Sequence, residues 1–252
     1  MKAFIISLSE IESSISTATS VHTKLTEYGF DAVLFEGTYG PAALEQYEKE
    51  GRTVHPYGIK TEPLSNEDNI KIKKSIAKID TKNQYLIEGV KRSPVDENAM
   101  WRVTRPGVLG CFYSHYRLWE ECVKLNETIF IFEDDVIFIR PYTPVEFDEV
   151  LVVALGKDLY RTKFKSVYET PEYTTPIALD FHRTSMPGAV GYGITPTAAK
   201  KLVNTYKKTV LPADNAINQF EVNIKIHSHL IGRAALEDDG KISLTSAGAW
   251  RL

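Results

Sequence analysis

Three consecutive acidic residues, Glu133, Asp134 and Asp135, lie inside the apolar segment IFIFEDDVIF. Buried carboxylates cost free energy unless positive charge or hydrogen-bond donors meet them. If the segment is a strand, alternation places the Glu133 and Asp135 side chains on one face and Asp134 on the other. Two carboxylates at the end of an apolar strand suit Mg²⁺ or Mn²⁺, which fill their remaining positions with phosphates and water. This pattern predicts group transfer away from a nucleotide diphosphate, with the ion as a Lewis acid.

A structural role is the alternative for the same three carboxylates. Acidic residues at strand ends often form ion pairs with Lys or Arg side chains, and a perturbed carboxylate is only a probabilistic marker of a functional site. The residue pattern by itself leaves both interpretations open.

A further carboxylate, Asp214, lies in the segment LPADNAINQF. We predict that it is the general base of an inverting transfer, in which it removes the proton of an acceptor hydroxyl. In such a reaction the sugar carbon is attacked from the face opposite the leaving diphosphate. The alternative is that Asp214 caps a helix that begins at AINQF, because Asp is a preferred N-cap residue.

The hydrophobic pattern predicts the elements that must position these residues. Residues 2–8 (KAFIISL) and 32–37 (AVLFEG) have the composition of buried strands, and residues 13–28 between them carry apolar or small residues at helical spacing. A strand, a helix and a strand joined by short turns form a βαβ unit with parallel strands. In open α/β sheets, ligands bind at the carboxyl ends of such strands. Three residues there are predicted to contact a donor substrate: Ser7, Leu8 and Glu36.

A second helix is predicted to follow Pro106 and Gly107 and to lead directly into the acidic segment, because its apolar residues recur at helical intervals. Another helix is predicted from Pro196, with Thr195 as its N-cap. Further strands are predicted at residues 149–155, 189–195 and 222–231. The fold class is therefore α/β.

Residues 38–105 lose this pattern, because Gly and Pro interrupt the segment repeatedly. We interpret it as an acceptor-side insertion or lid, since long irregular segments in compact domains are usually functional. Cations interleaved with aromatic side chains, as in DLYRTKFKSVY (158–168), suit a phosphate-rich partner, although a basic face can also be merely solvent-exposed. Four basic residues are predicted to contact the acceptor: Arg102, Arg105, Arg161 and Lys163.

The composition is that of an ordinary soluble globular protein, with 252 residues and a formal net charge of -3. No apolar run approaches the roughly 18 to 20 residues that span a bilayer, and the N-terminal apolar segment is too short for a secretory signal. We therefore expect a cytoplasmic protein. Cys111 and Cys122 are about 16 Å apart along the expected helix and have no CxxC context, so we expect reduced thiols without a zinc or redox role.

Three segments resemble glycosyltransferase family 25, which includes lipooligosaccharide sugar transferases. The family's GCxxSHxxxW helix, followed by a strand that ends in EDD, is similar to PGVLGCFYSHYRLWEECVKLNETIFIFEDDVIF (106–138). Its glycine-aromatic strand and helix resemble GAVGYGITPTAAKKLV (188–203), and its PxD segment resembles LPADNAINQF (211–220). The resemblance covers residues 106–230 well and residues 1–37 loosely. The family's arginine-rich stretch after the first strand is replaced here by ESSISTATSVHTK.

The resemblance implies a GT-A fold, with a Rossmann-like, mostly parallel sheet flanked by helices in a single domain over residues 1–252. It also implies a divalent cation, Mn²⁺ or Mg²⁺, and a UDP-sugar as donor. Glu133 and Asp135 would be metal ligands. A C-terminal histidine would be the third ligand, either His227 or, as we prefer, His229, which share a face if they lie on one strand. A hydrogen-bonded structural histidine is the alternative.

Five other residues are assigned to the donor site by the same resemblance: Gly107, Ser114, His115, Asp134 and Gly191. For His115, a role in helix packing is the alternative. Asp134 would face either the donor sugar or a positively charged partner.

Two acceptors remain open. Bacterial relatives extend lipooligosaccharide at the inner membrane, whereas bacteriophage relatives are thought to glycosylate hydroxymethylated cytosine in DNA. We favour 5-hydroxymethylcytosine in phage DNA, because the sequence ends at AWRL without a basic amphipathic tail for a membrane surface. The protein would then act in the host cytoplasm, on a base that leaves the stack to reach the donor. A non-catalytic nucleotide-sugar-binding protein is a third interpretation.

Overall fold

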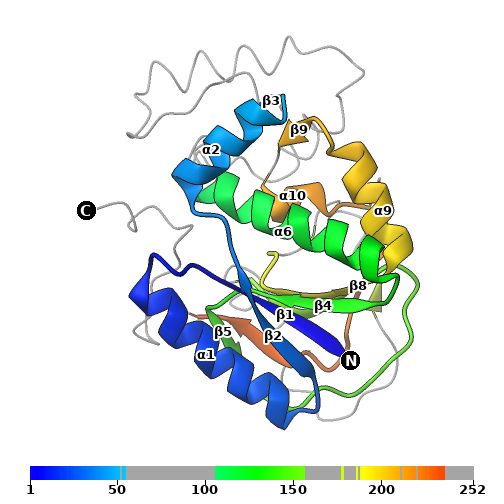
Figure 1. Ribbon diagram of the computed structural model, residues 1–252. Helices are drawn as coiled ribbons and strands as arrows, with labels where there is room; N and C mark the ends of the chain where they lie inside the picture. Colours follow the sequence, from blue (N-terminus) through cyan, green and yellow to red (C-terminus); the bar gives the residue numbers. More distant parts are fainter. Residues whose placement is uncertain are drawn as a thin grey trace, which may run out of the picture.

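The computed structural model describes residues 1–51, 53–54, 106–156, 177–178, 186, 188–210, 212–219 and 221–235. These residues form a curled mixed sheet with helices on both faces (Figure 1). The predicted α/β class is confirmed in this respect. Within the described ranges, no helix combines the length and the apolar character needed to cross a membrane.

The N-terminal βαβ unit has the predicted form. It consists of β1 (Lys2–Ser7), α1 (Glu12–Glu27) and β2 (Asp31–Glu36), and β1 pairs in parallel with both β2 and β4 (Ile129–Phe132). The register aligns Ser7 with Glu36 and Ile5 with Phe132. The carboxyl ends of the three strands therefore meet at one edge of the sheet, just before the acidic residues that follow β4.

The sheet is mixed, and the prediction of a mostly parallel sheet was wrong. Its strand order is β2-β1-β4-β8-β6-β10-β7. At its centre, β8 (Gly191–Ile194) is antiparallel to both β4 and β6 (Val150–Leu155), whereas β6 is parallel to β10 (Ile224–Ile226). The βαβ pattern of the N-terminus does not continue beyond β4, because β4 is followed by a turn and a strand rather than by a crossover helix.

Short strands complete the sheet. β11 (Gly232–Ala234) is antiparallel to β5 (Val136–Phe138) and parallel to β6, and β7 (Ile177–Ala178) is antiparallel to β10. β3 (Thr53–Val54) and β9 (Thr209–Val210) form a separate parallel pair.

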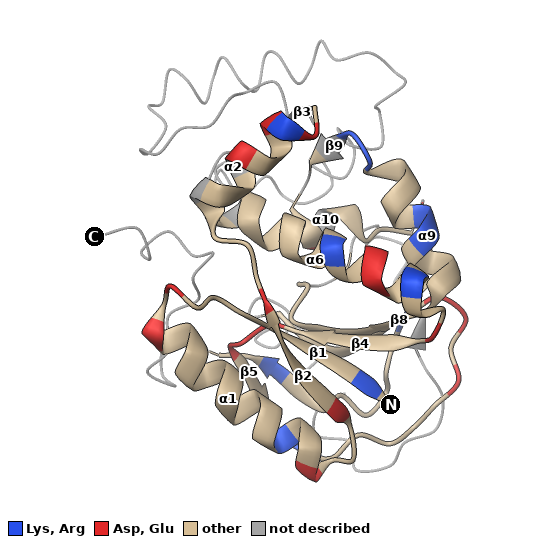
Figure 2. Cartoon of the chain, viewed as in Figure 1, with Lys and Arg blue, Asp and Glu red and all other residues tan. Residues whose placement is uncertain are grey.

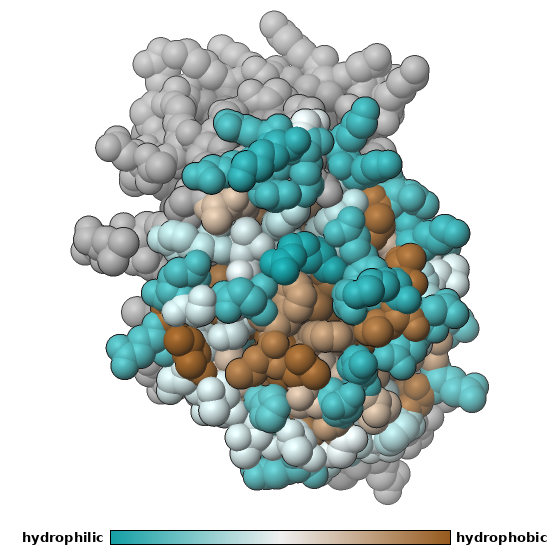
Figure 3. All heavy atoms as spheres, in the orientation of Figure 1, coloured by the Kyte–Doolittle hydropathy of each residue, from teal (hydrophilic) through white to brown (hydrophobic). Residues whose placement is uncertain are grey.

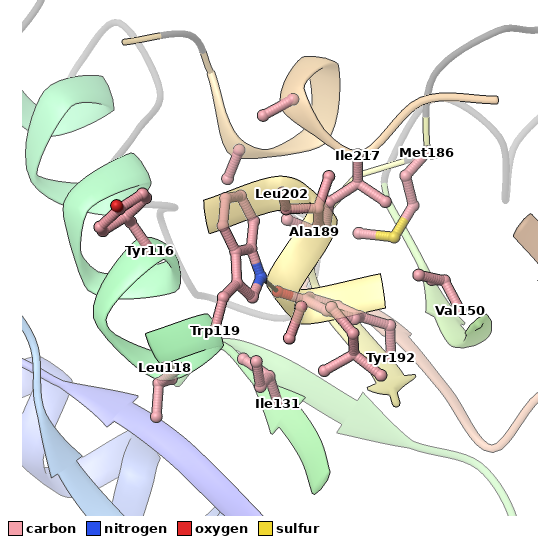
Figure 4. Packing of buried hydrophobic residues seen from close by; sticks show 14 of the residues in the cluster. Tyr116, Leu118, Trp119, Ile131, Val150, Met186, Ala189, Tyr192, Leu202 and Ile217 are labelled. Atoms are coloured by element: carbon pink, nitrogen blue, oxygen red, sulfur yellow. Dashed lines mark hydrogen bonds between the residues drawn. The ribbon is translucent and has the colours of Figure 1, made fainter. Parts of the chain in front are cut away.

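Two buried cores lie on opposite faces of the sheet, and the side chains of β4 alternate between them. Ile129 and Ile131 pack with the helices α2 (Gly40–Lys49), α6 (Pro106–Leu125), α9 (Pro196–Thr205) and α10 (Ala213–Ala216). Phe130 and Phe132 pack with α1 on the other face. Figure 4 shows the α6 side, where Trp119, Tyr192 and Leu202 lie close together. This alternation is what a strand buried on both faces requires.

Helix α2 lies inside the segment that was predicted to be irregular. Pro41 occupies its first turn, where a missing backbone N–H costs nothing, and Gly40 and Gly51 stand at its two ends rather than interrupting it. Ala43 and Tyr47 of α2 pack against α6. The approach is close at Gly110 of α6, where an added Cβ would lie 2.3 Å from the carbonyl oxygen of Thr38.

The predicted cap of α9 is confirmed, because the side chain of Thr195 accepts a hydrogen bond from the backbone N–H of Ala198. The edge strand β2 exposes two large apolar side chains, Val33 and Leu34, at 39% and 46% of their surface. Figure 3 shows apolar atoms gathered on this face of the molecule, over β2, among hydrophilic residues.

Candidate functional site

The three acidic residues occupy the turn between β4 and β5, which corrects the prediction that they lie along one strand. β5 leaves the line of β4 to pair with β11, so strand alternation does not set the side-chain directions. The backbone holds the turn at both ends: Glu133 N donates to Val190 O at 3.0 Å, and Asp135 O accepts from Ala235 N at 2.9 Å. Figure 2 shows the acidic residues of this turn beside β5.

Glu133 turns toward α6. Its Oε1 accepts from the Cys111 thiol at 3.4 Å and lies 3.5 Å from His115 Nε2. The Glu133 side chain is 21% exposed, whereas His115 is fully buried. The ligand atoms of Cys111, His115 and Glu133 all lie within 4.8 Å of one another. Within the described part of the chain, the basic side chain that lies nearest to the Glu133 carboxylate is therefore an imidazole rather than the Lys or Arg of the structural alternative.

Asp134 turns the other way, toward α1. Its Oδ2 accepts from Thr17 Oγ1 at 3.4 Å, and the Ser14 hydroxyl also faces the carboxylate. The pKa of Asp134 is raised from 3.8 to about 6, mainly by burial and also by the charge of Glu133, while the hydroxyls of Ser14 and Thr17 partly offset the rise.

Asp135 is 9% exposed, and its charge acts on the Cys111 thiol together with those of Glu133 and Asp214. Burial raises the pKa of the Cys111 thiol well above its ordinary value, and the nearby charges of Glu133, Asp214 and Asp135 add to this effect. The structure thus brings together Asp214, the predicted base, with the two predicted metal ligands, although Asp214 is about 80 positions later in the sequence. Asp214 is the second residue of α10, whose N-cap is Pro212, so it is not the N-cap.

The two C-terminal histidines do not share the face of a strand, because β10 ends at Ile226 and both lie in the irregular segment that follows. His227 Nε2 lies 2.9 Å from Thr143 O, and His227 Nδ1 accepts from the backbone N–H of His229. Burial lowers the pKa of both imidazoles. His227 is thus a structural histidine, with both ring nitrogens bound to the backbone.

His229 lies at the wrong end of β5 to join the acidic turn. The pairing of β5 with β11 places Ala235 beside Asp135, and Gly232 is paired with Phe138 at the opposite end of β5. His229 precedes Gly232, and the positive charge of Arg140 contributes to lowering its pKa. The structure does not bring His229 together with Glu133 and Asp135 as the third ligand.

The predicted donor residues of the N-terminal unit lie at the same edge as the acidic turn. Ser7 is buried at the end of β1, and its carbonyl oxygen accepts from Gly37 N. The backbone N–H of Leu8 is bound by the Ser14 hydroxyl, and the Glu36 carboxylate accepts from Ser9 N at 3.0 Å. Ser14 therefore links the end of β1 to Asp134.

Three other residues predicted to contact the donor substrate belong to α6 and β8, behind this edge. Ser114 is 1% exposed, and its hydroxyl donates to Gly110 O and accepts from Thr38 N, which ties α6 to the chain entering α2. Gly191 lies in β8, where an added Cβ would lie 2.8 Å from the Phe132 ring. Gly107 lies in the first turn of α6 and is partly exposed. Packing accounts for Ser114 and Gly191.

The residues that sequence analysis missed are Cys111, Ser14, Thr17 and Tyr192. One signal was present for the first of these. Cys111, His115 and Trp119 recur at intervals of four, which places them on one stripe of a helix. Tyr192 carried no comparable signal, because its contact with that stripe depends on the position of β8 in the sheet.

The predicted acceptor residues Arg102, Arg105, Arg161 and Lys163 lie outside the described residues, as does the predicted insertion beyond Val54.

The carboxylate oxygens of the site suit a hard divalent ion. Glu133 and Asp135 supply carboxylate oxygens at the carboxyl end of β4, with Asp214 nearby, and oxygen ligands are those that Mg²⁺ and Mn²⁺ prefer. The site is also only partly open to solvent, because Glu133 is partly exposed and Asp135 is nearly buried. The arrangement could hold an ion that is shared with an anionic substrate.

Two comparisons with known proteins bear on this site. The family described as glycosyltransferase family 25 (LPS biosynthesis protein) matches residues 58–217, a span that includes α6, the acidic turn and α10. Lipooligosaccharide biosynthesis protein lex-1 of Haemophilus influenzae is 29% identical over 128 residues, which cover 46% of this chain and 41% of the relative. The matched part is thus less than half of that relative's length.

Proposed function

Because the chain belongs to glycosyltransferase family 25, we propose that it moves a sugar from a UDP-sugar to an acceptor hydroxyl with the help of a divalent ion. One observation carries this proposal: Asp214 comes from a segment about 80 positions after Glu133 and Asp135, and the charges of all three carboxylates act on the Cys111 thiol, beside the carboxyl edge of the sheet. That edge is where open α/β sheets bind nucleotides.

Each residue has a defined task in the proposed reaction. Glu133 and Asp135 would hold Mn²⁺ or Mg²⁺, which would neutralise charge on the diphosphate of the donor. In an inverting displacement, the acceptor oxygen forms a bond to the anomeric carbon while the bond from that carbon to the UDP oxygen breaks. The electron pair of the broken bond leaves with UDP. The hydroxyl proton passes to the Asp214 carboxylate, which acts as general base.

Asp134 would have a supporting role. Its carboxylate faces the Ser14 and Thr17 hydroxyls rather than the other acidic residues. Ser14 also binds the backbone N–H of Leu8, so Asp134 would help to hold the end of β1 in place beside the donor.

We propose a glycan of the lipooligosaccharide type as the acceptor. Support comes from the relative whose name assigns it to lipooligosaccharide biosynthesis. Neither comparison supports the competing acceptor, 5-hydroxymethylcytosine in DNA, and the four basic residues predicted to contact an acceptor lie outside the described part of the chain. Protein incubated with labelled UDP-sugars and either truncated lipooligosaccharide or hydroxymethylcytosine DNA separates the two. Transfer to DNA alone would overturn the choice of a glycan.

The catalytic proposal is tested with two variants, each of which replaces one carboxylate with a neutral amide. Asp135→Asn is expected to reduce Mn²⁺-dependent release of UDP from a UDP-sugar by at least about 100-fold, because it removes a metal ligand. Glu27→Gln is the control, since Glu27 pairs with Lys24 on the exposed end of α1. Full activity of Asp135→Asn, or wild-type activity that persists in EDTA, would contradict metal catalysis through this residue. Stabilisation by UDP without any turnover would instead indicate a non-catalytic binding protein.

A further inference from the structure

A chain of buried polar groups links Trp119 of α6 to Tyr192 of β8 and then to His115 of α6, and it ends at Glu133. Trp119 Nε1 lies 2.9 Å from the Tyr192 hydroxyl, and that hydroxyl lies 2.9 Å from His115 Nδ1. On the other side of the ring, His115 Nε2 lies 3.5 Å from Glu133 Oε1. Trp119, Tyr192 and His115 are all 0% exposed. Figure 4 shows the Trp119 nitrogen directed at the Tyr192 oxygen.

The direction of each hydrogen bond follows from the chemistry of the groups. An indole N–H can only donate, so the Tyr192 oxygen accepts from Trp119. The hydroxyl proton of Tyr192 then needs an acceptor, and among the described residues its other hydrogen-bond partner is His115 Nδ1. A buried hydroxyl proton without an acceptor is unfavourable, because the group has given up its hydrogen bond to water. Tyr192 therefore donates to Nδ1, which must lack a proton.

We infer that Trp119 and Tyr192 hold His115 as the neutral tautomer with its proton on Nε2, and that this N–H orients the Glu133 carboxylate. His115 is thus a positioning residue for Glu133. The importance of this orientation for sugar transfer rests on the proposed function, whereas the tautomer itself does not. Since 3.5 Å is longer than a good hydrogen bond, a small rotation of the partly exposed Glu133 side chain would complete the contact.

Two other states of His115 would leave a buried hydrogen-bond donor without an acceptor. A metal ion bound by Cys111, His115 and Glu133, whose ligand atoms are close enough together, would take Nε2 and move the proton to Nδ1. An imidazolium would carry protons on both nitrogens. In either state Nδ1–H would point at the Tyr192 oxygen, and the proton of Tyr192 would lose its acceptor within the described residues.

Nitrogen NMR of the full chain labelled at histidine distinguishes the three states, because protonated and unprotonated ring nitrogens have well-separated shifts. The chain has six histidines, and the signal of His115 is identified by its loss in His115→Gln. In EDTA we expect a single tautomer with the proton on Nε2. Tyr192→Phe should replace it with a mixture of tautomers, since the group that selects one is removed. A proton on Nδ1, or on both nitrogens, would overturn the inference, as would conversion to Nδ1–H on adding stoichiometric Zn²⁺.

A second measurement tests the positioning of Glu133 rather than helix packing. The amide of Gln can present a donor near the place of Nε2, whereas Ala cannot. We expect His115→Ala to weaken Mn²⁺ binding in the presence of UDP by about tenfold and His115→Gln to weaken it much less. Equal affinities in the two variants would overturn the positioning role. If wild-type protein binds Mn²⁺ and UDP but transfers no sugar, the proposed function fails while the tautomer result stands.

Discussion

Neighbouring carboxylates in the acidic turn have different surroundings and therefore different tasks. Asp134 faces two hydroxyls of α1 and has the pKa raised to about 6, whereas Glu133 faces a thiol and an imidazole of α6. Asp134 thus takes up a proton more readily than an exposed carboxylate does, and this reduces the repulsion inside the turn.

Cys122 provides a prediction about pH that is remote from the site. Burial raises the pKa of its thiol from 9.0 to about 12, so in the native state it keeps a proton that the unfolded chain loses above pH 9. The native state then binds more protons, and stability falls as pH rises. Urea unfolding should show that wild-type protein loses about 1 kcal/mol more than Cys122→Ala between pH 8 and pH 10. The same pH dependence in both proteins would contradict this assignment.

At the scale of residues, sequence reasoning singled out the three acidic residues and Asp214, but it did not predict the turn or the directions of the acidic side chains. The apolar residues on both sides of Glu133 and Asp135 matched a continuous strand, and nothing local indicated that β5 turns away to pair with β11. His229 was misplaced for a related reason, because its segment was taken for a longer strand than β10. Both errors concern where a strand ends, which distant pairing decides.

At the scale of elements, the helices were the most predictable part of the fold. The apolar spacing of α6 and the Thr195 cap of α9 are local properties, and both were confirmed. The direction of β8 was not predictable, because it depends on where a distant segment enters the sheet. α2 was overlooked because its bounding glycines were counted as interruptions.

The contact between α2 and α6 gives a prediction in which packing opposes helix propensity. Gly110→Ala would place a Cβ 2.3 Å from the Thr38 carbonyl oxygen, so the two segments must separate. We expect the free energy of unfolding to fall by about 1 to 3 kcal/mol, as for other overpacked sites. Intrinsic propensity alone predicts the opposite sign, since Ala is favoured over Gly in helices by about 1 kcal/mol. Equilibrium unfolding in urea decides between them, and a more stable variant would contradict the close contact.

At the scale of the whole molecule, two cores on either side of one sheet hold the site at the sheet's carboxyl edge. α1 supplies hydroxyls from one face, and α6 supplies the thiol and imidazole from the other. A ligand bound at this edge therefore contacts elements of both layers and should stabilise the entire fold.

Thermal unfolding tests that coupling. UDP and Mn²⁺ at about 100 times the dissociation constant should add about 2.7 kcal/mol, and raise the Tm of a chain of this size by several degrees. Asp135→Asn should lose most of this shift and Glu27→Gln should retain it. An equal shift in both variants would place the ligand elsewhere.

The central position of β8 has a consequence for how the chain is made. β1, β2 and β4 can leave the ribosome and pair while β8, which must cover the open side of β4, is still untranslated. During that interval a row of backbone donors and acceptors along Ile129–Phe132 is free to join other nascent chains. Slow translation or truncation before Gly191 should thus favour aggregation. A chaperone that shields the unpaired edge of β4 would have to bind it while a few dozen further codons are translated.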